Sequence, residues 1–277
     1  MLARQRQGVI LTTVERDGGV RVSDLVTELG VSDMTVRRDI ETLADKGLVH
    51  KVHGGATLAD RSIDEPGFSV KSEMNPVQKS EIARTAASLI PPGTSVAVSA
   101  GTTAYAVAVE LRAVKRLTVV TNSPRVAELL YDPSRDDQLV VMTGGVRTPS
   151  DALAGPVANA MLATTHVDTL ILGVHGIDLQ AGLTTPNLQE AQTNRALIRS
   201  AKKIIVVADH SKWGVIGLST IATLDQVHTL VTDAQLDEEA RRELSRHDIN
   251  LILARGPIPD TLGQHRALNG LGTNRAT

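Results

Sequence analysis

Small polar residues follow several apolar runs of this 277-residue sequence, and their types suit the binding of an anion. Gly101-Thr102-Thr103 stands directly before a helical pattern. Glycine lets a ligand approach the backbone closely, and exposed N–H groups with two hydroxyls suit a phosphate group. Lys79, earlier in the chain, could add positive charge to the same anion. Taken alone, Gly101-Thr102-Thr103 also fits an ordinary helix cap, and Lys79 also fits a solvated surface lysine.

Hydroxyl, amide, glycine and ionisable groups follow four further apolar runs. His175 could hydrogen-bond a sugar hydroxyl or be satisfied within its loop, while Asp209 and Lys212 either pair with each other or bracket a polyol. Glu190 opens a helical segment, where a carboxylate also interacts favourably with the helix dipole. Together these sets predict a site for a small, hydroxylated and phosphorylated molecule. The candidate ligand-binding residues are Lys79, Ser99, Gly101, Thr102, Thr103, Thr121, Asn122, Ser123, Gly144, Gly145, His175, Glu190, Asp209 and Lys212.

A site of this kind needs a framework that brings the ends of distant apolar runs together. The runs are 94–98, 117–120, 139–142, 169–172, 204–208, 229–232 and 250–253, and they alternate with helical segments at 77–90, 104–112, 124–131, 156–164, 188–201 and 237–247. Continuous apolar strands separated by helices predict an α/β domain with a mostly parallel sheet covered on both faces. Ligands bind such sheets beyond the carboxyl ends of the strands.

The first 58 residues have a different pattern. Periodicity predicts helices over 2–16, 22–29 and 32–46, then a strand over 48–52 and a turn over 53–55. Val36, Ile40 and Leu43 share one face of the third helix, for which Ser32 is a good N-cap. Two helices around Gly30 form a helix-turn-helix, and the hairpin after them makes it winged. A small α+β winged helix-turn-helix domain is therefore expected.

The N-terminal half of the third helix could enter the major groove of DNA. Thr35 and Arg38 would then face the bases, and Arg37 could reach either a base or a phosphate. On the wing, Lys51 and His53 would lie near the backbone or the minor groove. In the first helix, Arg4 and Arg6 are expected to be solvated or near phosphate. The candidate DNA-binding residues are Ser32, Thr35, Arg37, Arg38, Lys51 and His53, and the alternative is a solvated helix with ordinary surface arginines.

Composition excludes several classes of function. The chain has no cysteine, so it has no disulfide framework, thiolate nucleophile or zinc-thiolate site, and neither a metal nor a cofactor is expected. One Phe, two Tyr and one Trp supply too few rings to bind single-stranded nucleic acid by base stacking. We find no signal peptide and no run long enough to span a membrane, so a cytoplasmic protein is expected.

The charge distribution bears on DNA binding. Residues 1–58 contain eight Lys/Arg and eight Asp/Glu, and the whole chain has a net charge of −2. Because phosphate neutralisation supplies most non-specific affinity, one such domain would bind weakly, and two or more acting together would be needed. A homo-oligomer, either dimer or tetramer, is therefore expected. The predicted organisation is a DNA-binding domain at 1–58, a linker at 59–75, a ligand-binding domain at 76–255 and a disordered tail at 256–277.

The N-terminal stretch closely resembles the DNA-binding domain of DeoR-type bacterial transcriptional regulators. That family has a Ser-x-x-Thr-[Ile/Val]-Arg-Arg-Asp helix and a His-Gly-Gly-Ala wing, which stand here at Ser32, 35–39 and 53–56. The resemblance continues to about residue 255. The family's Gly-Thr-Thr motif stands here at 101–103, its Thr-Asn-Ser at 121–123, its Gly-Gly at 144–145, its Gly-Leu-Thr at 182–184 and its Asp-x-Ser-Lys at 209–212. The glutamate of its Glu-Ala pair is Glu190, and its helix lysine is Lys79.

This resemblance implies a repressor of a carbohydrate-metabolism operon. It implies operator DNA as one partner and a phosphorylated sugar or related metabolite as inducer. It also implies an effector domain whose fold is similar to ribose-phosphate isomerases and CoA transferases. Two positions depart from the family: Ser99 replaces a usual Asp, which removes an acceptor for a sugar hydroxyl, and Lys71 stands where Arg is common.

Two other functions compete with the regulator. A phosphosugar isomerase with a DNA-binding appendage would need a carboxylate base and a polarising cation, for which Glu190 and Lys212 are the candidates. Loss of an acid at Ser99 weakens that interpretation. An architectural DNA-binding protein without a ligand is the other alternative, but a second domain of nearly 180 residues is more than dimerisation requires. A regulator that is not an enzyme is therefore the favoured prediction.

Overall fold

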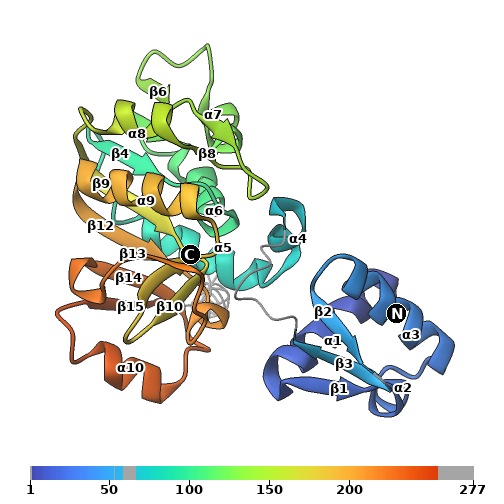
Figure 1. Cartoon of the computed structure of the whole chain (residues 1–277). Helices are drawn as coiled ribbons and strands as arrows, with labels where there is room; N and C mark the ends of the chain where they lie inside the picture. The colour runs from blue at the N-terminus through green and yellow to red at the C-terminus, as the bar shows by residue number, and fades with distance from the viewer. Residues whose placement is uncertain (1, 53, 59–66, 255–277) are drawn as a thin grey trace, which may run out of the picture.

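The computed structural model describes residues 2–52, 54–58 and 67–254. Figure 1 shows a small N-terminal domain and a larger α/β domain, with helix α4 (Phe68–Glu73) on the side of the larger domain that faces the smaller one. His53, most of the expected linker and the tail predicted to be disordered lie outside the described residues. No helix in the described part of the chain is long and apolar enough to cross a membrane.

The N-terminal domain is a winged helix-turn-helix. Its elements are α1 (Ala3–Asp17), β1 (Gly19–Arg21), α2 (Val22–Leu29), α3 (Asp33–Asp45), β2 (Val49–Val52) and β3 (Gly55–Leu58). Gly30 takes a left-handed conformation (φ 63°) at the turn between α2 and α3. The strands form an antiparallel sheet in the order β1-β3-β2. Strand β1 is absent from the sequence prediction, which only ends the first helix at this point.

The seven predicted apolar runs all become strands of one sheet. They are β4 (Ser95–Val98), β5 (Leu117–Thr121), β6 (Gln138–Met142), β9 (Val167–Gly173), β12 (Ala201–Val207), β14 (Thr229–Asp233) and β15 (Asn250–Ala254). Every neighbouring pair in the order β15-β14-β12-β9-β4-β5-β6 is parallel. The prediction of an α/β domain with a mostly parallel sheet is confirmed.

Helices cover both faces of this sheet, as continuous apolar strands require. One face packs on α5 (Pro76–Ala87), α6 (Thr102–Leu111) and α7 (Pro124–Leu130), and the other on α8 (Pro156–Leu162), α9 (Leu188–Ser200) and α10 (Glu238–Leu244). In β12, Ile204 and Val206 belong to one core, while Ile205 and Val207 belong to the other. The two-residue period of a strand thus divides the core into two layers.

The strand order reverses direction between β4 and β9. From β4 the chain proceeds outward to β5 and β6, and from β9 it proceeds the other way to β12, β14 and β15. The loops that leave β4 and β9 therefore diverge and open a crevice beyond the carboxyl ends of the strands. This reversal is the place where doubly wound sheets bind their ligands.

Several short elements lie outside the predicted pattern. They are the antiparallel strands β7 (Val146–Arg147), β8 (Leu153–Ala154), β10 (Gly176–Asp178), β11 (Gly182–Thr185) and β13 (Ser219–Ala222), and two 3-10 turns, His210–Lys212 and Leu224–Gln226. Helix α4 also belongs to this group, because it occupies part of the segment interpreted as a linker. That part of the segment is therefore helical rather than irregular.

Candidate ligand pocket and nucleic-acid surface

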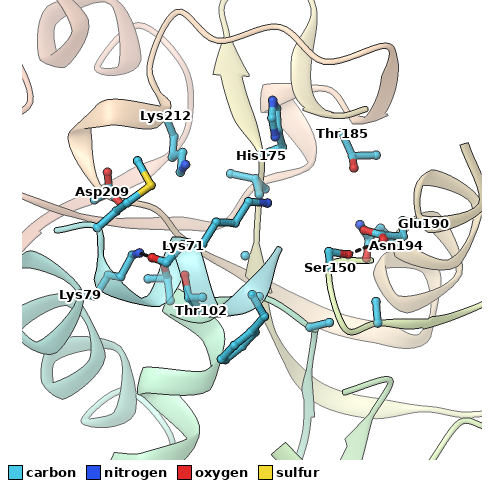
Figure 2. A pocket seen from close by; sticks show the side chains of 18 of the residues that line it. Lys71, Lys79, Thr102, Ser150, His175, Thr185, Glu190, Asn194, Asp209 and Lys212 are labelled. Carbon is cyan, nitrogen blue, oxygen red and sulfur yellow. Dashed lines mark hydrogen bonds between the residues drawn. The ribbon is translucent and has the colours of Figure 1, made fainter. Parts of the chain in front are cut away.

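A pocket lies where the strand order reverses, beyond the ends of β4, β5, β9 and β12. Its walls come from the loops after these strands and from α4, α9 and residues 150–152 (Figure 2). Nine of the predicted ligand-binding residues line it: Lys79, Gly101, Thr102, Thr103, Asn122, His175, Glu190, Asp209 and Lys212. Segments that are far apart in the sequence therefore meet in one place, as the parallel topology predicts.

One side of the pocket carries a cluster of amino groups. Figure 2 shows Lys79 near Thr102, Lys212 near Asp209, and the Lys71 side chain extending from the same side toward the middle of the pocket. Lys79 is buried, and its Nζ donates a hydrogen bond to the backbone carbonyl of Lys71 at 2.5 Å. Thr102 begins α6 directly after Gly101, whose φ of 125° is in a region that side chains rarely adopt. We call these three lysines and Thr102 the cationic end.

Asp209 is a carboxylate next to the cationic end. It is 3% exposed, and its Oδ1 accepts hydrogen bonds from Asn75 Nδ2 at 3.0 Å and from the Ser211 hydroxyl at 2.5 Å. Burial raises the pKa of Asp209, but the charge of Lys212, the Ser211 hydrogen bond and the charge of Lys79 together lower it below its usual value. The formal charges of the three lysines and of Asp209 add up to +2 (3 − 1).

The opposite side of the pocket is polar and acidic. Figure 2 shows Ser150, Glu190 and Asn194 grouped there, with Thr185 beside them. Glu190 is buried, and the Ser150 hydroxyl donates a short hydrogen bond to its Oε1. Asn187 caps α9 by accepting from the Glu190 backbone N–H at 3.2 Å, which fixes the first turn of this helix. We call Ser150, Glu190 and Asn194 the polar end, and its donors and acceptors suit hydroxyl groups.

Three predicted hydroxyl residues are buried behind the pocket and do not line it. Ser99 Oγ accepts from the Gly173 backbone N–H at 2.9 Å, so it joins the ends of β4 and β9. Thr121 Oγ1 donates to the carbonyl of Val98 at 2.7 Å. Ser123 caps α7. These side chains have structural hydrogen-bond partners, which explains why they position the loops rather than face the cavity.

Gly144 and Gly145 also lie away from the pocket. Gly145 has a φ of 121°, and a Cβ on it would lie 2.7 Å from the carbonyl oxygen of Ala154. The close approach at Gly145 is thus to the backbone of strand β8, while a Cβ on Gly144 would lie 3.3 Å from the Val157 side chain. Both glycines are needed by the turn into the β7–β8 hairpin.

Four further polar residues of the lining are absent from the predicted ligand-binding set. Lys71, Ser150, Thr185 and Asn194 are all in the walls. Asn194 follows Glu190 by four residues, so helical spacing places both on one face of α9 and could have identified it. Ser150 has no such signal because it sits in a loop between two-residue strands. Lys71 appears in the sequence analysis only as a departure from the family pattern.

Four of the predicted DNA-contacting residues lie on α3 or at its N-cap, and Lys51 lies on the wing. Ser32 Oγ caps the helix by accepting from the Thr35 backbone N–H at 3.3 Å. Arg38 is exposed, and Arg37 is also exposed but pairs with Asp33 at 2.5 Å. On the wing, Lys51 Nζ lies 2.9 Å from Glu41 Oε1. Exposed ion pairs contribute little to stability, so Arg37 and Lys51 can exchange these partners for phosphate.

Two family models match the chain. One, described as a DeoR-like helix-turn-helix domain, matches residues 6–62, and the other, the DeoR C terminal sensor domain, matches residues 74–234. The chain belongs to the DeoR family of transcriptional regulators. Its second domain is therefore a sensor domain, and all the residues that line the pocket except Phe68 and Lys71 lie within the matched range.

Relatives of this DeoR-family chain match over nearly its whole length. The HTH-type transcriptional regulator GlpR of Haloferax volcanii is 34% identical over 253 residues, which cover 91% of this chain and 98% of that protein. The glycerol-3-phosphate regulon repressor of Escherichia coli K12 is 32% identical over 254 residues, covering 91% and 100%. Because its relatives are regulators and repressors, this DeoR-family chain is a DNA-binding regulator, and the isomerase alternative is not favoured.

Among solved structures, ribose 5 phosphate isomerase A from Neisseria gonorrhoeae is similar over part of the chain. It has a TM-score of 0.36 and 18% identity, and the match covers 50% of this chain and 53% of the isomerase.

In the Arg-Arg-Asp part of the DeoR motif, the two arginines are exposed on α3 and the aspartate is buried. Asp39 is 4% exposed and points into the domain, where it accepts from Arg6 Nε at 2.7 Å and from Gln7 Nε2 at 3.2 Å. The side chain of Arg6 is only 14% exposed. The interpretation of Arg6 as a solvated side chain is therefore wrong, because this residue pairs with Asp39 and attaches α1 to α3.

Proposed function

We propose that this regulator represses a carbohydrate-metabolism operon and leaves its operator when a phosphorylated sugar or related metabolite occupies the sensor pocket. The observation that carries this proposal is the separation of charge along the pocket. A phosphate monoester has a charge of about −1.5 to −2 at neutral pH, which complements the formal charge of +2 of the cationic end together with Asp209. The polar end then receives the hydroxyl groups of the same molecule.

The names of the relatives support the same class of ligand. They include a glycerol-3-phosphate regulon repressor and a putative aga operon transcriptional repressor, both of Escherichia coli strains. We propose by this similarity that the present chain also acts as a repressor in the cytoplasm. The predicted ligand-binding residues that line the pocket, with Lys71, Ser150 and Asn194, form its effector site.

We also propose that the regulator binds operator DNA as a dimer or tetramer. The eight basic residues of 1–58 are balanced by eight acidic ones, and Arg37 and Lys51 carry acidic partners on the same surface. Two linked domains gain affinity by raising the effective concentration of the second one. For release, the effector must favour one conformational state over the other, and a coupling of about 1–3 kcal/mol would be typical.

A thermal-shift screen tests the ligand class. Ligand that binds only the folded protein raises the melting temperature by mass action. We expect one or more sugar phosphates to raise it while the corresponding free sugars do not, and we expect Lys212→Ala to remove the shift. Lys203→Ala, which changes an exposed lysine of β12, is the matched control. An equal shift with the free sugar would reject the phosphate as the recognised group.

A further inference from the structure

Helix α4 contacts the sensor pocket and the DNA-binding domain at the same time. Phe68, Lys71 and Met74 line the pocket. Val70 and Met74 pack against the N-terminal core, whose buried members include Ile10, Leu25, Val36, Ile40 and Leu43. An exposed ion pair between Arg4 and Glu73, at 3.3 Å, adds a polar contact between α1 and α4. Residues of α4 and its C-cap Met74 therefore contact both the pocket and the DNA-binding domain. Figure 1 shows α4 between the two domains.

Phe68 anchors α4 to the sensor domain. Its ring meets the Tyr105 ring of α6 edge to face, with centroids 5.6 Å apart and planes at 88°. The guanidinium carbon of Arg125 in α7 lies 4.4 Å from the centre of the same ring. At the other end of the helix, the backbone carbonyl of Lys71 accepts the hydrogen bond from Lys79. An anion that recruits the amino groups of these two lysines would thus act directly on α4.

A second series of contacts connects the polar end of the pocket to α4. Ser150, which bonds Glu190, is followed by Asp151, and Asp151 pairs with Arg125 and Arg147 through short contacts. Asp151 is buried and has a φ of 69°, a conformation that non-glycine residues adopt rarely. Its position between the two arginines fixes the orientation of Arg125 over Phe68. A ligand that displaces Ser150 from Glu190 therefore moves the loop that holds this anchor.

We propose that α4 is the element that transmits occupancy of the pocket to the DNA-binding domain. This inference rests on the proposed function, because it takes the pocket as the effector site. Ligand groups at the cationic and polar ends change the position of α4, and Val70 and Met74 carry that change to the core that supports α3. By linkage, operator DNA must then alter the affinity of the pocket for its ligand by the same factor.

The test separates binding from transmission. The operator duplex is selected by this protein from a random pool and labelled with a fluorophore. Full-length wild type, Val70→Ser and the exposed control Ser69→Ala are each titrated into this duplex. The melting temperature of each protein is measured in parallel. The probes are inorganic phosphate and glycerol 3-phosphate, each at millimolar concentration. We expect either probe to stabilise all three proteins and to weaken operator binding of wild type and Ser69→Ala by about tenfold, a coupling within the usual range. Val70→Ser should keep the thermal shift but change its operator affinity by less than about twofold, within 0.4 kcal/mol.

A second arm needs no ligand. Phe68→Ala removes a sensor-domain anchor without touching the DNA-binding domain, and we expect it to change the operator Kd of the free protein by about threefold or more. Val70→Ala replaces Val70→Ser if the latter fails to bind operator without a probe. A probe response of wild-type size in the Val70 variant would overturn the role of α4. If neither probe stabilises wild type, the proposed pocket chemistry fails, and an unchanged operator Kd in Phe68→Ala would then overturn the role of α4 separately.

Discussion

Arg38 and Asp39 are neighbours in the chain but serve different surfaces. The Arg38 side chain is exposed on α3, whereas Asp39 is buried against Arg6 of α1. A single turn of helix thus contains one residue available to DNA and one that holds the helix in place. Substitution of Arg38 should therefore weaken operator binding, whereas substitution of Asp39 should destabilise the packing of α3.

Replacing Arg38 by alanine should weaken operator binding and leave the fold intact. A bidentate contact to guanine is worth about 1–3 kcal/mol, so the operator Kd should rise by roughly 5- to 150-fold. Arg16→Ala, which removes another exposed arginine at the end of α1, is the control. Fluorescence anisotropy measures both. Wild-type affinity in Arg38→Ala would show that α3 presents a different face to DNA.

Thr102→Val should remove the ligand response while operator affinity without ligand stays unchanged. The hydroxyl lies at the cationic end, and valine keeps the shape of threonine but leaves the ligand oxygen without a partner. Isothermal calorimetry with the best sugar phosphate from the screen should show about a tenfold or greater loss of affinity. A matched Thr12→Val change on exposed α1 should have no effect, and full binding by Thr102→Val would remove the start of α6 from the site.

Asp209 should make the stability of the protein depend on pH. Its pKa is lowered in the folded chain from a usual value of 3.8, so its carboxylate stabilises the fold above that pH, and the contribution is lost as the pH falls below it. Asp209→Asn should melt at a lower temperature than wild type at neutral pH. The difference should shrink below about pH 4. Melting curves in a phosphate-free buffer series measure it, and a constant difference would mean that the carboxylate acts only through packing.

Among the elements, α3 depends on a buried ion pair for its attachment. Removing one partner of such a pair costs about 3–5 kcal/mol, because the other charge stays buried without compensation. We expect Asp39→Ala to lower protection from hydrogen exchange in α1 and α3 of the full chain, with little change in the seven-stranded sheet. The double change Arg6→Met with Asp39→Leu should restore much of the protection. If Asp39→Ala alone keeps full protection, apolar packing is sufficient to hold α3.

The parallel strands and long helices were predictable because each has its own signal. The run at 204–208, for example, is apolar at every position since β12 is buried on both faces. Strand β10 has no such signal, because a close backbone approach shapes it. A Cβ on Gly176 would lie 2.0 Å from the carbonyl oxygen of Val215, and a distant contact of this kind cannot be seen in a local pattern.

The lining of the pocket was likewise predictable only in part. Residues that follow long strands, such as Asp209 and His175, line it because topology alone brings strand ends together. Ser99 follows a strand too, but its first partner is the backbone of Gly173, so it faces the fold. Phe68 and Lys71 were missed as site residues because α4 is six residues long and is held by contacts with two domains.

At the scale of the whole molecule, weak single domains imply paired binding. A duplex with two half-sites should bind about 10²- to 10⁴-fold more tightly than one with a single half-site, provided both domains can engage at once. The slope of log affinity against log salt should be close to double for the longer duplex. Sedimentation of the free protein gives the oligomeric state. Equal affinity for both duplexes would show that one domain is sufficient.

The reversal in strand order also has a consequence during protein synthesis. The pocket joins segments that lie far apart in sequence: Asn75 and Asp209, which bond each other, are separated by 134 residues. At about 5–20 residues per second, a ribosome needs on the order of 10 s to connect them. The winged helix-turn-helix is complete long before that, since domains fold as units in chain order. A nascent chain would therefore contain a folded DNA-binding domain before it is able to sense a metabolite.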